Sequence, residues 1–182
     1  MLDCARTLPF AEALAVADSA LRRRACEREE LISRARTLRG AGSARVRRVL
    51  QLADERADNP MESVLRAVVA ATGVGGFEPQ LQVDEGGLLA RVDLGDRRRR
   101  IALEADSFTF HGTRAALDHD CRRYSDMVAA DWSVLRFSYE QVMFDHSWVA
   151  SRVTALALLA DARLARRHHP RGGRIHSREM RR

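Results

Sequence analysis

Residues 77–108 carry the pattern that most constrains how this chain can fold. Three short runs rich in apolar residues lie here, at 77–84, 88–94 and 101–108. A DEGG sequence, typical of a hairpin turn, separates the first two runs, and Arg97–Arg100 separate the second and third. Short runs joined by such turns predict three strands in an antiparallel meander.

Helical periodicity flanks these strands on both sides. Asn59-Pro60 is a typical helix start, and the helix that it begins is expected to end at Gly73. Residues 113–130 predict another helix. Its apolar residues recur at three- and four-residue spacing, and they are Leu117, Cys121, Tyr124 and Val128.

A buried strand at 132–139 and a last helix at 147–165 complete the order. A strand reached through a helical crossover usually joins its sheet in parallel. Trp132 and Phe137 are expected in the core rather than on a surface that stacks against bases. The predicted fold class is therefore a mixed α/β fold with an αβββαβ core.

The residues outside this core predict a helical segment and a tail. Helical patterns occur at 9–38 and 44–57, with RGAGS between them. The stretch RHHPRGGRIHSREMRR, residues 167–182, has no apolar period, which is typical of a disordered segment. We therefore expect a small helical segment at 1–57, the α/β domain at 58–162 and a basic tail after it.

The composition narrows the class of protein. No run of 18 apolar residues is present, so no membrane span is expected. Cys4, Cys26 and Cys121 have neither metal-ligand spacing nor the pattern of a disulfide framework. The first residues lack the layout of a signal peptide. These features predict a cytoplasmic protein.

The net charge of +6 is unevenly distributed along the chain. Residues 21–48 and 163–182 each carry +7, whereas residues 49–162 carry −6. Basic flanks can hold phosphates electrostatically without reading a base sequence. The acidic centre would repel phosphates unless a cation lay there.

Asp93, Glu104 and Asp106 interrupt two of the predicted strands. If Arg97–Arg100 form the hairpin loop, the register places Asp93 opposite Glu104, with Cβ atoms roughly 4.5–5.5 Å apart. Strand alternation places Asp106 on the face of Glu104. Like charges that face each other are destabilising, and a divalent cation relieves them. Carboxylate oxygens suit Mg²⁺ or Mn²⁺.

An ordinary solvent-exposed face is the alternative explanation for these acids. In that case Asp93 would form an ion pair with Arg91 or with the Arg97–Arg100 loop. The spacing alone does not decide between the metal site and the exposed face.

The same residues resemble a known family. An acid on a helix, then Asp, then Glu-X-Lys on the far arm of a hairpin within an αβββαβ core is the pattern of the PD-(D/E)XK nuclease superfamily. More closely, residues 60–146 resemble the domain of unknown function 559. That small bacterial family is related to the very-short-patch mismatch repair endonucleases. The matching stretches are NPMESVLR, RVDL, LEAD, FHGTRAALDHDCRRY and WSVLRFSYEQVM.

The resemblance implies a restriction-endonuclease-like core and a metal-dependent DNA endonuclease that hydrolyses phosphodiester bonds, in DNA repair or in defence against phages and mobile elements. The catalytic residues that it implies are Glu62, Asp93, Glu104, Asp106 and His111. The four acids would hold Mg²⁺ or Mn²⁺, and Arg114 and Arg122 would contact a DNA phosphate. Asp106 stands where the wider superfamily has Lys, and the chain contains no Lys. The group that activates water is therefore open.

Structural roles are alternatives for several of these residues. Glu62 is placed to close a capping box after Asn59. His111 is placed to cap the following helix. Arg114, Asp118 and Arg122 have the i, i+4 spacing of a ladder of ion pairs on a helix.

Two other classes of function remain open. One is a catalytically silent DNA-binding or antitoxin-like regulator that keeps the nuclease fold, and the other is a protein–protein module with surface acids. Residues 1–40 resemble the connector of longer proteins, some of which carry an N-terminal winged-helix domain similar to abortive-infection type IV antitoxins. We expect that this chain lacks such a domain. Its oligomeric state is left open.

Overall fold

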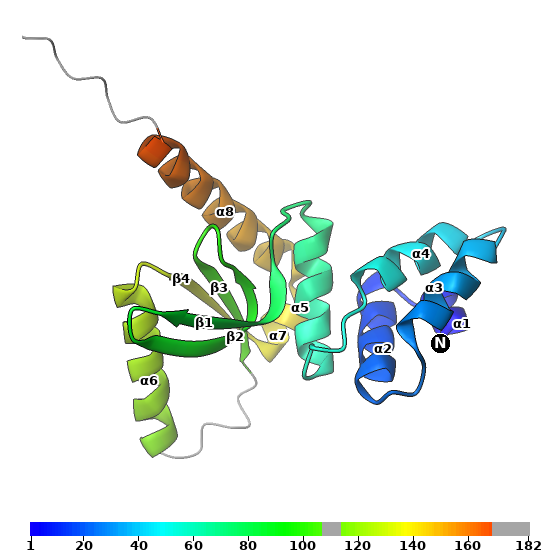
Figure 1. The fold of residues 1–182 in the computed structure, drawn as a ribbon, viewed down its shortest axis with the longest axis horizontal. Coiled ribbons are helices and arrows are strands. Elements are labelled where there is room, and N and C mark those ends of the chain that lie inside the picture. The colour runs from blue at the N-terminus through cyan, green and yellow to red at the C-terminus, as the bar shows by residue number, and fades with distance from the viewer. Residues whose placement is uncertain (107–113, 169–182) are drawn as a thin grey trace, which may run out of the picture.

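In the computed structural model, which describes residues 1–106 and 114–168, four strands form one mixed sheet (Figure 1). The order β1-β2-β3-β4 follows the chain, with β1 to β3 antiparallel and β4 parallel to β3. The strands are β1 (Glu78–Glu85), β2 (Leu88–Asp96), β3 (Ile101–Asp106) and β4 (Ser133–Ser138). The predicted meander and parallel crossover are confirmed, and the fold is mixed α/β.

Helices precede the sheet, follow β3 and complete the described part of the chain. The N-terminal ones are α1 (Leu2–Thr7), α2 (Phe10–Arg22), α3 (Arg28–Thr37) and α4 (Ser43–Leu52). The others are α5 (Pro60–Ala71), α6 (Arg114–Ala129), α7 (Tyr139–Phe144) and α8 (His146–His168). No helix in the described ranges is long and apolar enough to cross a membrane.

Helices pack against both faces of the sheet, although Asp84 and Leu89 of the β1–β2 hairpin are exposed. One face packs against α5, α7 and α8, and Ile101, Leu103 and Phe137 lie fully buried in that layer. The other face packs against α6, where Met127 is fully buried with side chains of all four strands. Trp132 and Phe137 are 2% and 1% exposed, so the prediction that they belong to the core is confirmed.

The turn chemistry explains the two hairpins. Gly86 and Gly87 both have positive φ, and Glu85 pairs with Leu88 across them, which is the geometry of a two-residue type I′ turn. The second hairpin closes over residues 97–100, with Asp96 paired to Ile101 as the sequence predicts.

The alternation of inward and outward side chains along β1 and β2 is interrupted at one pair of positions. The register sets Gln80 opposite Asp93, and neither residue belongs to the ladder of pairs between the two strands. Gln80 has a φ of 52°, in the left-handed region that a side chain rarely adopts. Val92 packs toward α6, whereas Leu94, two residues later, packs toward α5. The strands therefore exchange their faces at Asp93.

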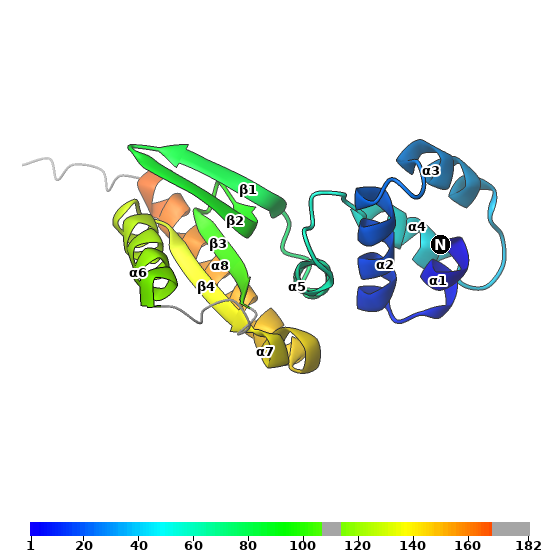
Figure 2. The same ribbon diagram turned by 90° about the horizontal axis from the view of Figure 1, so that it is seen from below.

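Helices α1 to α4 form a unit with its own buried core, on the side of α5 away from the sheet (Figures 1 and 2). Leu14, Val46 and Val49 are fully buried in it. This segment, predicted as a connector, thus contains enough apolar side chains to pack on itself.

A buried ion pair joins this unit to α5. Arg66 of α5 donates from Nη1 to Asp18 Oδ2 of α2 at 2.5 Å, and the two side chains are 9% and 0% exposed. Asp18 Oδ1 accepts from the backbone N–H of Asp54 at 2.8 Å, and Arg66 also donates to the carbonyl of Leu52. These bonds connect α2, α5 and residues 52–54 at one buried point.

Some predicted elements differ from the structure. The single helix at 9–38 is wrong, because residues 23–27 turn the chain between α2 and α3 and Arg24 has a φ of 52°. The helix at 44–57 ends at Leu52, since Arg28 and Arg22 donate to the carbonyls of Ala53 and Ala57 in an extended connection.

Two further predictions differ from the structure: two short helices are not predicted, and α6 buries a different face. The sequence patterns do not predict α1 or α7, which are six residues each and too short to show a period. Of the predicted stripe on α6, Leu117 and Val128 are 55% and 62% exposed, and Met127 is the buried residue instead. Helix α8 continues to His168, past the boundary expected at residue 162, and the rest of the predicted tail lies outside the described residues.

Candidate functional site

The site is built around Asp93, at the point where β2 and β3 part. The ladder between these strands includes Leu94–Leu103 but does not continue to Asp93–Glu104. Instead, Asp93 Oδ2 accepts a hydrogen bond from the backbone N–H of Ala105 at 2.8 Å. The predicted opposition of Asp93 and Glu104 is thus replaced by a side chain that bonds to the neighbouring strand.

The positively charged partners proposed for Asp93 are engaged elsewhere. Arg91 forms an ion pair with Asp58 at 3.1 Å. The loop arginines 97–100 bond to the carbonyl of Gln82, to Asp96, to Asp161 and to Glu85. Within the described ranges Asp93 forms no ion pair of its own, so the exposed-face explanation does not describe this residue.

Glu104 lies on β3 with its side chain turned toward α6. Arg123 of α6 donates from Nη1 to Glu104 Oε1 at 2.8 Å, and the same nitrogen lies 3.3 Å from the carbonyl of Arg91. Glu104 is 6% exposed. A carboxylate on a strand and a guanidinium on the covering helix thus form a largely buried ion pair.

Glu62 enters the site from the first turn of α5. Its backbone N–H donates to the side chain of Asn59 at 3.0 Å, so Asn59 caps the helix. Its carboxylate accepts from Asn59 Nδ2 at 2.6 Å, from the N–H of Asp58 at 2.8 Å and from Gln80 Nε2 at 2.8 Å. The structural role predicted for Glu62 is therefore real, although the partners differ from those of a capping box.

Asp93 repels both Glu62 and Glu104 electrostatically. Burial, and next the charge of Asp93, raise the pKa of Glu104 to about 7, against the attraction of Arg123. Burial and then Asp93 likewise raise the pKa of Glu62 to about 7. The pKa of Asp93 itself is raised by burial, and the bond from Ala105 opposes that shift. The charge of Asp93 therefore contributes to the raised pKa of both glutamates.

Asp106 lies apart from this trio. It forms an ion pair with Arg136 of β4, and Arg136 stacks over the ring of Tyr124 at 4.3 Å from the ring centroid. Arg123 also contacts that ring, at 4.6 Å, and donates to Tyr124 Oη at 2.7 Å. Burial, followed by the charge of Glu104, raises the pKa of Tyr124 to about 12. One aromatic ring thus holds the two arginines that neutralise Glu104 and Asp106.

A metal ion would find two suitable ligands here rather than four. In residues 1–106 and 114–168, no group of three or more His, Cys, Asp or Glu side chains is arranged to hold a metal ion. Mg²⁺ is commonly bound by one or two carboxylates, with waters and substrate phosphates completing the coordination. Asp93 and Glu104, coupled electrostatically and rich in hard oxygen donors, fit such a site. Glu62 and Asp106 are satisfied by other partners.

The remaining predicted residues fall in different places. His111 lies outside the described residues. Arg114 and Arg122 are exposed on α6, and no ion pair with Asp118 forms among the described side chains, so the predicted ladder is absent there. The arginine that reaches the acids is the neighbouring Arg123.

Sequence reasoning missed Arg123, Tyr124 and Gln80 as parts of this site. Arg123 directly follows a predicted phosphate contact, and only the rotation of α6 on the sheet decides which of the two faces inward. Gln80 has an unusual role because its Oε1 atom is buried with no hydrogen-bond partner among the described residues, while its Nε2 bonds to Glu62. No sequence signal identifies its left-handed conformation.

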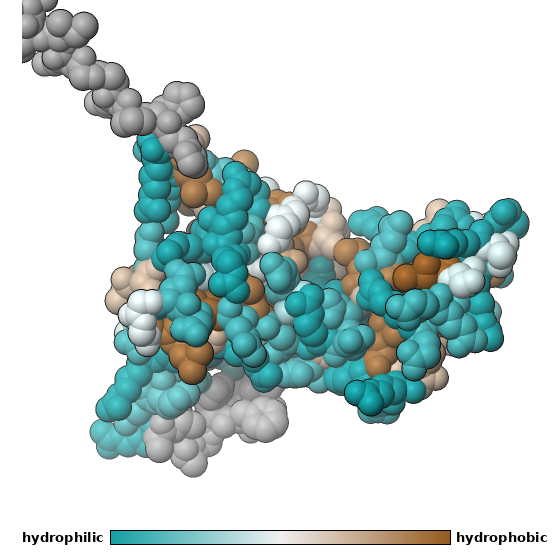
Figure 3. Space-filling view, in the orientation of Figure 1, coloured by the Kyte–Doolittle hydropathy of each residue, from teal (hydrophilic) through white to brown (hydrophobic). Residues whose placement is uncertain are grey.

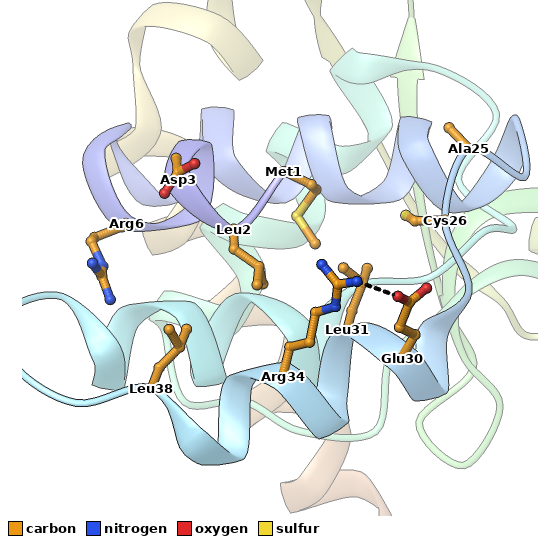
Figure 4. Close-up of a pocket in the computed structure, with 10 residues that line it drawn as sticks. All are labelled: Met1, Leu2, Asp3, Arg6, Ala25, Cys26, Glu30, Leu31, Arg34 and Leu38. Atoms are coloured by element: carbon orange, nitrogen blue, oxygen red, sulfur yellow. Dashed lines mark hydrogen bonds and ion pairs between the residues drawn. The ribbon is translucent and has the colours of Figure 1, made fainter.

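Two cavities flank different parts of the molecule. One of about 680 Å³ lies between the β1–β2 turn and α6, and it is lined by Arg122 and by Arg123, which bonds to Glu104. Another of about 520 Å³ lies between α1 and α3 in the N-terminal unit, where Met1, Leu2 and Leu31 face the ion pair of Arg34 with Glu30 (Figure 4). Only the first cavity adjoins the candidate site.

Comparisons with known proteins give relatives without a stated activity. No protein-family model matches the chain, and no solved structure matches it. Two uncharacterized proteins of Mycobacterium tuberculosis, one from each of two strains, are each 30% identical to it over 154 residues. The match covers 84% of this chain and 57% of each relative. The chain therefore spans little more than half the length of these curated relatives.

Proposed function

We propose that the chain is a metal-dependent DNA endonuclease with a restriction-endonuclease-like core, similar to the domain of unknown function 559. The observation that supports this most is the electrostatic coupling of Glu62 and of Glu104 to Asp93. Two of these acids have a pKa near 7, and Asp93 carries no ion pair in the described ranges. Repulsion of this kind costs stability, and a bound cation relieves it.

Asp93 and Glu104 would hold Mg²⁺ or Mn²⁺, which when bound supplies charge stabilisation at a phosphate and lowers the pKa of a coordinated water. Glu104 would have to share its carboxylate between the ion and Arg123. Arg123, next to the 680 Å³ cavity, is placed to move toward a phosphate. Glu62 can exchange a proton at neutral pH because its pKa is about 7.

A catalytically silent DNA-binding protein is the second candidate, and a specific observation favours it. Glu104 is neutralised by Arg123, Asp106 by Arg136, and Glu62 accepts three hydrogen bonds. Most of the acids are thus satisfied without an ion. In this case the cluster would only shape the domain, and the arginines would contact DNA.

Incubation with DNA separates the two candidates. Supercoiled, linear and mismatched duplexes should be nicked with Mg²⁺ or Mn²⁺ and left intact with EDTA. Asp93→Ala and Glu104→Ala should each reduce the rate at least about 100-fold, the scale of one lost electrostatic group in a catalytic site. Asp84→Ala, which removes an exposed acid from the same sheet, should leave the rate unchanged. Full activity in either site variant excludes this site, and no cleavage of any duplex favours the silent protein.

A further inference from the structure

The turn between α3 and α4 concentrates positive charge on the N-terminal unit. Residues 31–53 contain six arginines and no aspartate or glutamate. Four of the arginines are exposed around the turn, namely Arg36, Arg39, Arg45 and Arg47. Both views place this turn at the end of the molecule remote from the sheet (Figures 1 and 2). The surface over that end is largely hydrophilic (Figure 3).

Hydrogen bonds bring the guanidinium groups of Arg39 and Arg47 to one shared carbonyl. Arg39 Nη1 donates to the carbonyl of Leu38 at 3.1 Å and to that of Arg36 at 2.8 Å. Arg47 Nη1, from α4, lies 3.5 Å from the same carbonyl of Leu38. Two guanidiniums, one from the turn and one from α4, thus converge on the carbonyl of Leu38, which directly follows α3. We call Arg39, Arg45 and Arg47 the α3–α4 arginine surface.

The charge of this surface is not balanced by carboxylates. Arg45 Nη1 donates to the carbonyl of Leu8 at 3.1 Å, so the acceptors of this surface are mainly backbone carbonyls. In the part of the chain that the structure describes, none of its arginines forms an ion pair. Exposed arginines elsewhere differ, because Arg34 pairs with Glu30 and Arg56 with Asp54.

The backbone holds this surface in a defined place. Gly40 and Gly42 have φ of 81° and 77°, which a residue with a side chain rarely adopts. A Cβ atom on Gly42 would lie 2.6 Å from Cγ of Arg6, so α1 packs directly against the turn. An ordered turn loses little entropy on binding. Guanidinium groups presented in this way can bind phosphate oxygens in bidentate pairs.

We propose that the α3–α4 arginine surface binds the phosphate backbone of double-stranded DNA, separately from the candidate site. The choice of DNA among polyanions rests on the proposed function, whereas the binding needs neither metal nor cleavage. The ion pair of Asp18 with Arg66 fixes the N-terminal unit to α5, which also carries Glu62. A duplex held at this surface is therefore held at a set position relative to the acids.

The test is the salt dependence of duplex binding in EDTA, measured by fluorescence anisotropy between 50 and 200 mM NaCl. Each phosphate contact contributes about −0.9 to the slope of log K against log salt. The triple variant R39Q/R45Q/R47Q should therefore lose affinity and flatten the slope by about 2 to 3. The corresponding triple Arg→Lys variant should keep most of the slope, since it keeps the charge.

The matched control is R34Q/R56Q/R167Q. It removes the same charge from three exposed arginines that pair with Glu30, Asp54 and Asp131. Its slope should change by less than about 1, because these guanidiniums already have anionic partners. Equal flattening in both triple variants would mean that only net charge matters, which overturns the proposal. An unchanged slope in R39Q/R45Q/R47Q overturns it as well.

Additional measurements distinguish a failure of this proposal from a misfolded variant and from a failure of the nuclease hypothesis. If R39Q/R45Q/R47Q does not fold, the three single variants should each lower the slope by about 1, and no change in any of them counts against the proposal. Equally tight, equally salt-dependent binding of polyglutamate or single-stranded RNA would contradict the assignment to duplex DNA. Absence of cleavage by the parent, with the slope effect intact, would reject the catalytic proposal and leave this surface standing.

Discussion

Asp93 shows how one side chain can set the electrostatics of a whole site. After burial, its charge is the next cause that raises the pKa of Glu62 of α5 and of Glu104 of β3. Its own carboxylate is held by the N–H of Ala105 rather than by an arginine. The repulsion is therefore a property of the folded state, because the three acids are far apart along the unfolded chain.

The stability of the protein should consequently fall as pH rises from about 4.5 to about 7. A carboxyl with a raised pKa binds its proton more tightly in the folded state. Its contribution is thus fully present below the unfolded pKa and is lost as pH passes through the folded value of about 7. Asp93→Asn should lower both glutamate pKa values and make this fall smaller. In EDTA, the variant should melt above the parent at pH 8 and close to it at pH 5.

A second prediction concerns the effect of divalent ions on the melting temperature. The parent at pH 8 should gain melting temperature with Mn²⁺ or Mg²⁺, since a ligand of the folded state stabilises by RT ln(1 + [L]/Kd). Asp93→Asn should gain much less at matched ionic strength. Asp84→Asn, an exposed acid on β1, serves as the control and should behave as the parent does. Equal ion responses in the parent and Asp93→Asn would remove Asp93 from the set of ligands.

At the scale of elements, the central hairpin is shaped by a break in alternation. Gln80 adopts positive φ, Val92 and Leu94 face different layers, and β2 then runs as three consecutive buried residues to Asp96. Gly95 lies in this run and makes the exchange of faces possible. A Cβ atom there would lie 2.4 Å from Cδ2 of Leu81 and 3.0 Å from Cγ2 of Val92.

Gly95→Ala should therefore destabilise the protein by about 1–3 kcal/mol, the usual cost of an added methyl group in a packed core. Gly75→Ala is the matched change, because nothing lies within 4 Å of a Cβ at that position. It should change the free energy of unfolding by no more than about 0.5 kcal/mol. Urea unfolding of both variants measures the difference, and similar stabilities would show that β2 can shift away from Leu81.

At the scale of the whole molecule, two packed units share one buried ion pair. Helices α1 to α4 have their own apolar core, and the sheet has one on each of its faces. Asp18 and Arg66 connect them where water is excluded. Burial raises the pKa of Asp18, and the charge of Arg66 opposes that shift. The pair is a point at which the two units fold together.

Asp18→Ala should destabilise the protein by about 3–5 kcal/mol, because it leaves the guanidinium of Arg66 buried and unpaired. Replacing both residues, as Asp18→Leu with Arg66→Met, should recover most of that loss, since the two charges then leave the interior together. Urea unfolding followed by circular dichroism compares the three proteins. A loss below about 1 kcal/mol in Asp18→Ala would mean that the pair is hydrated and that the two units are only loosely joined.

The sequence by itself determined the order of strands and much of the pairing. Alternating apolar residues, the DEGG turn and the run Arg97–Arg100 specify three antiparallel strands, because hairpin register follows from local turn geometry. Asn59-Pro60 specifies the start of α5 for the same reason, since a helix cap is made by neighbours in the chain. The acids Asp93 and Glu104 could be named because strand neighbours follow from that register.

Only the tertiary structure decided how those acids are partnered. Arg123 rather than Arg122 reaches Glu104 because the rotation of α6 is set by packing of Met127 against the sheet. The left-handed conformation of Gln80 depends on contacts between β1, β2 and α5. The pairing of Asp18 with Arg66 joins residues 48 positions apart. Such contacts arise from the packing of surfaces, and no pattern of neighbouring residues encodes them.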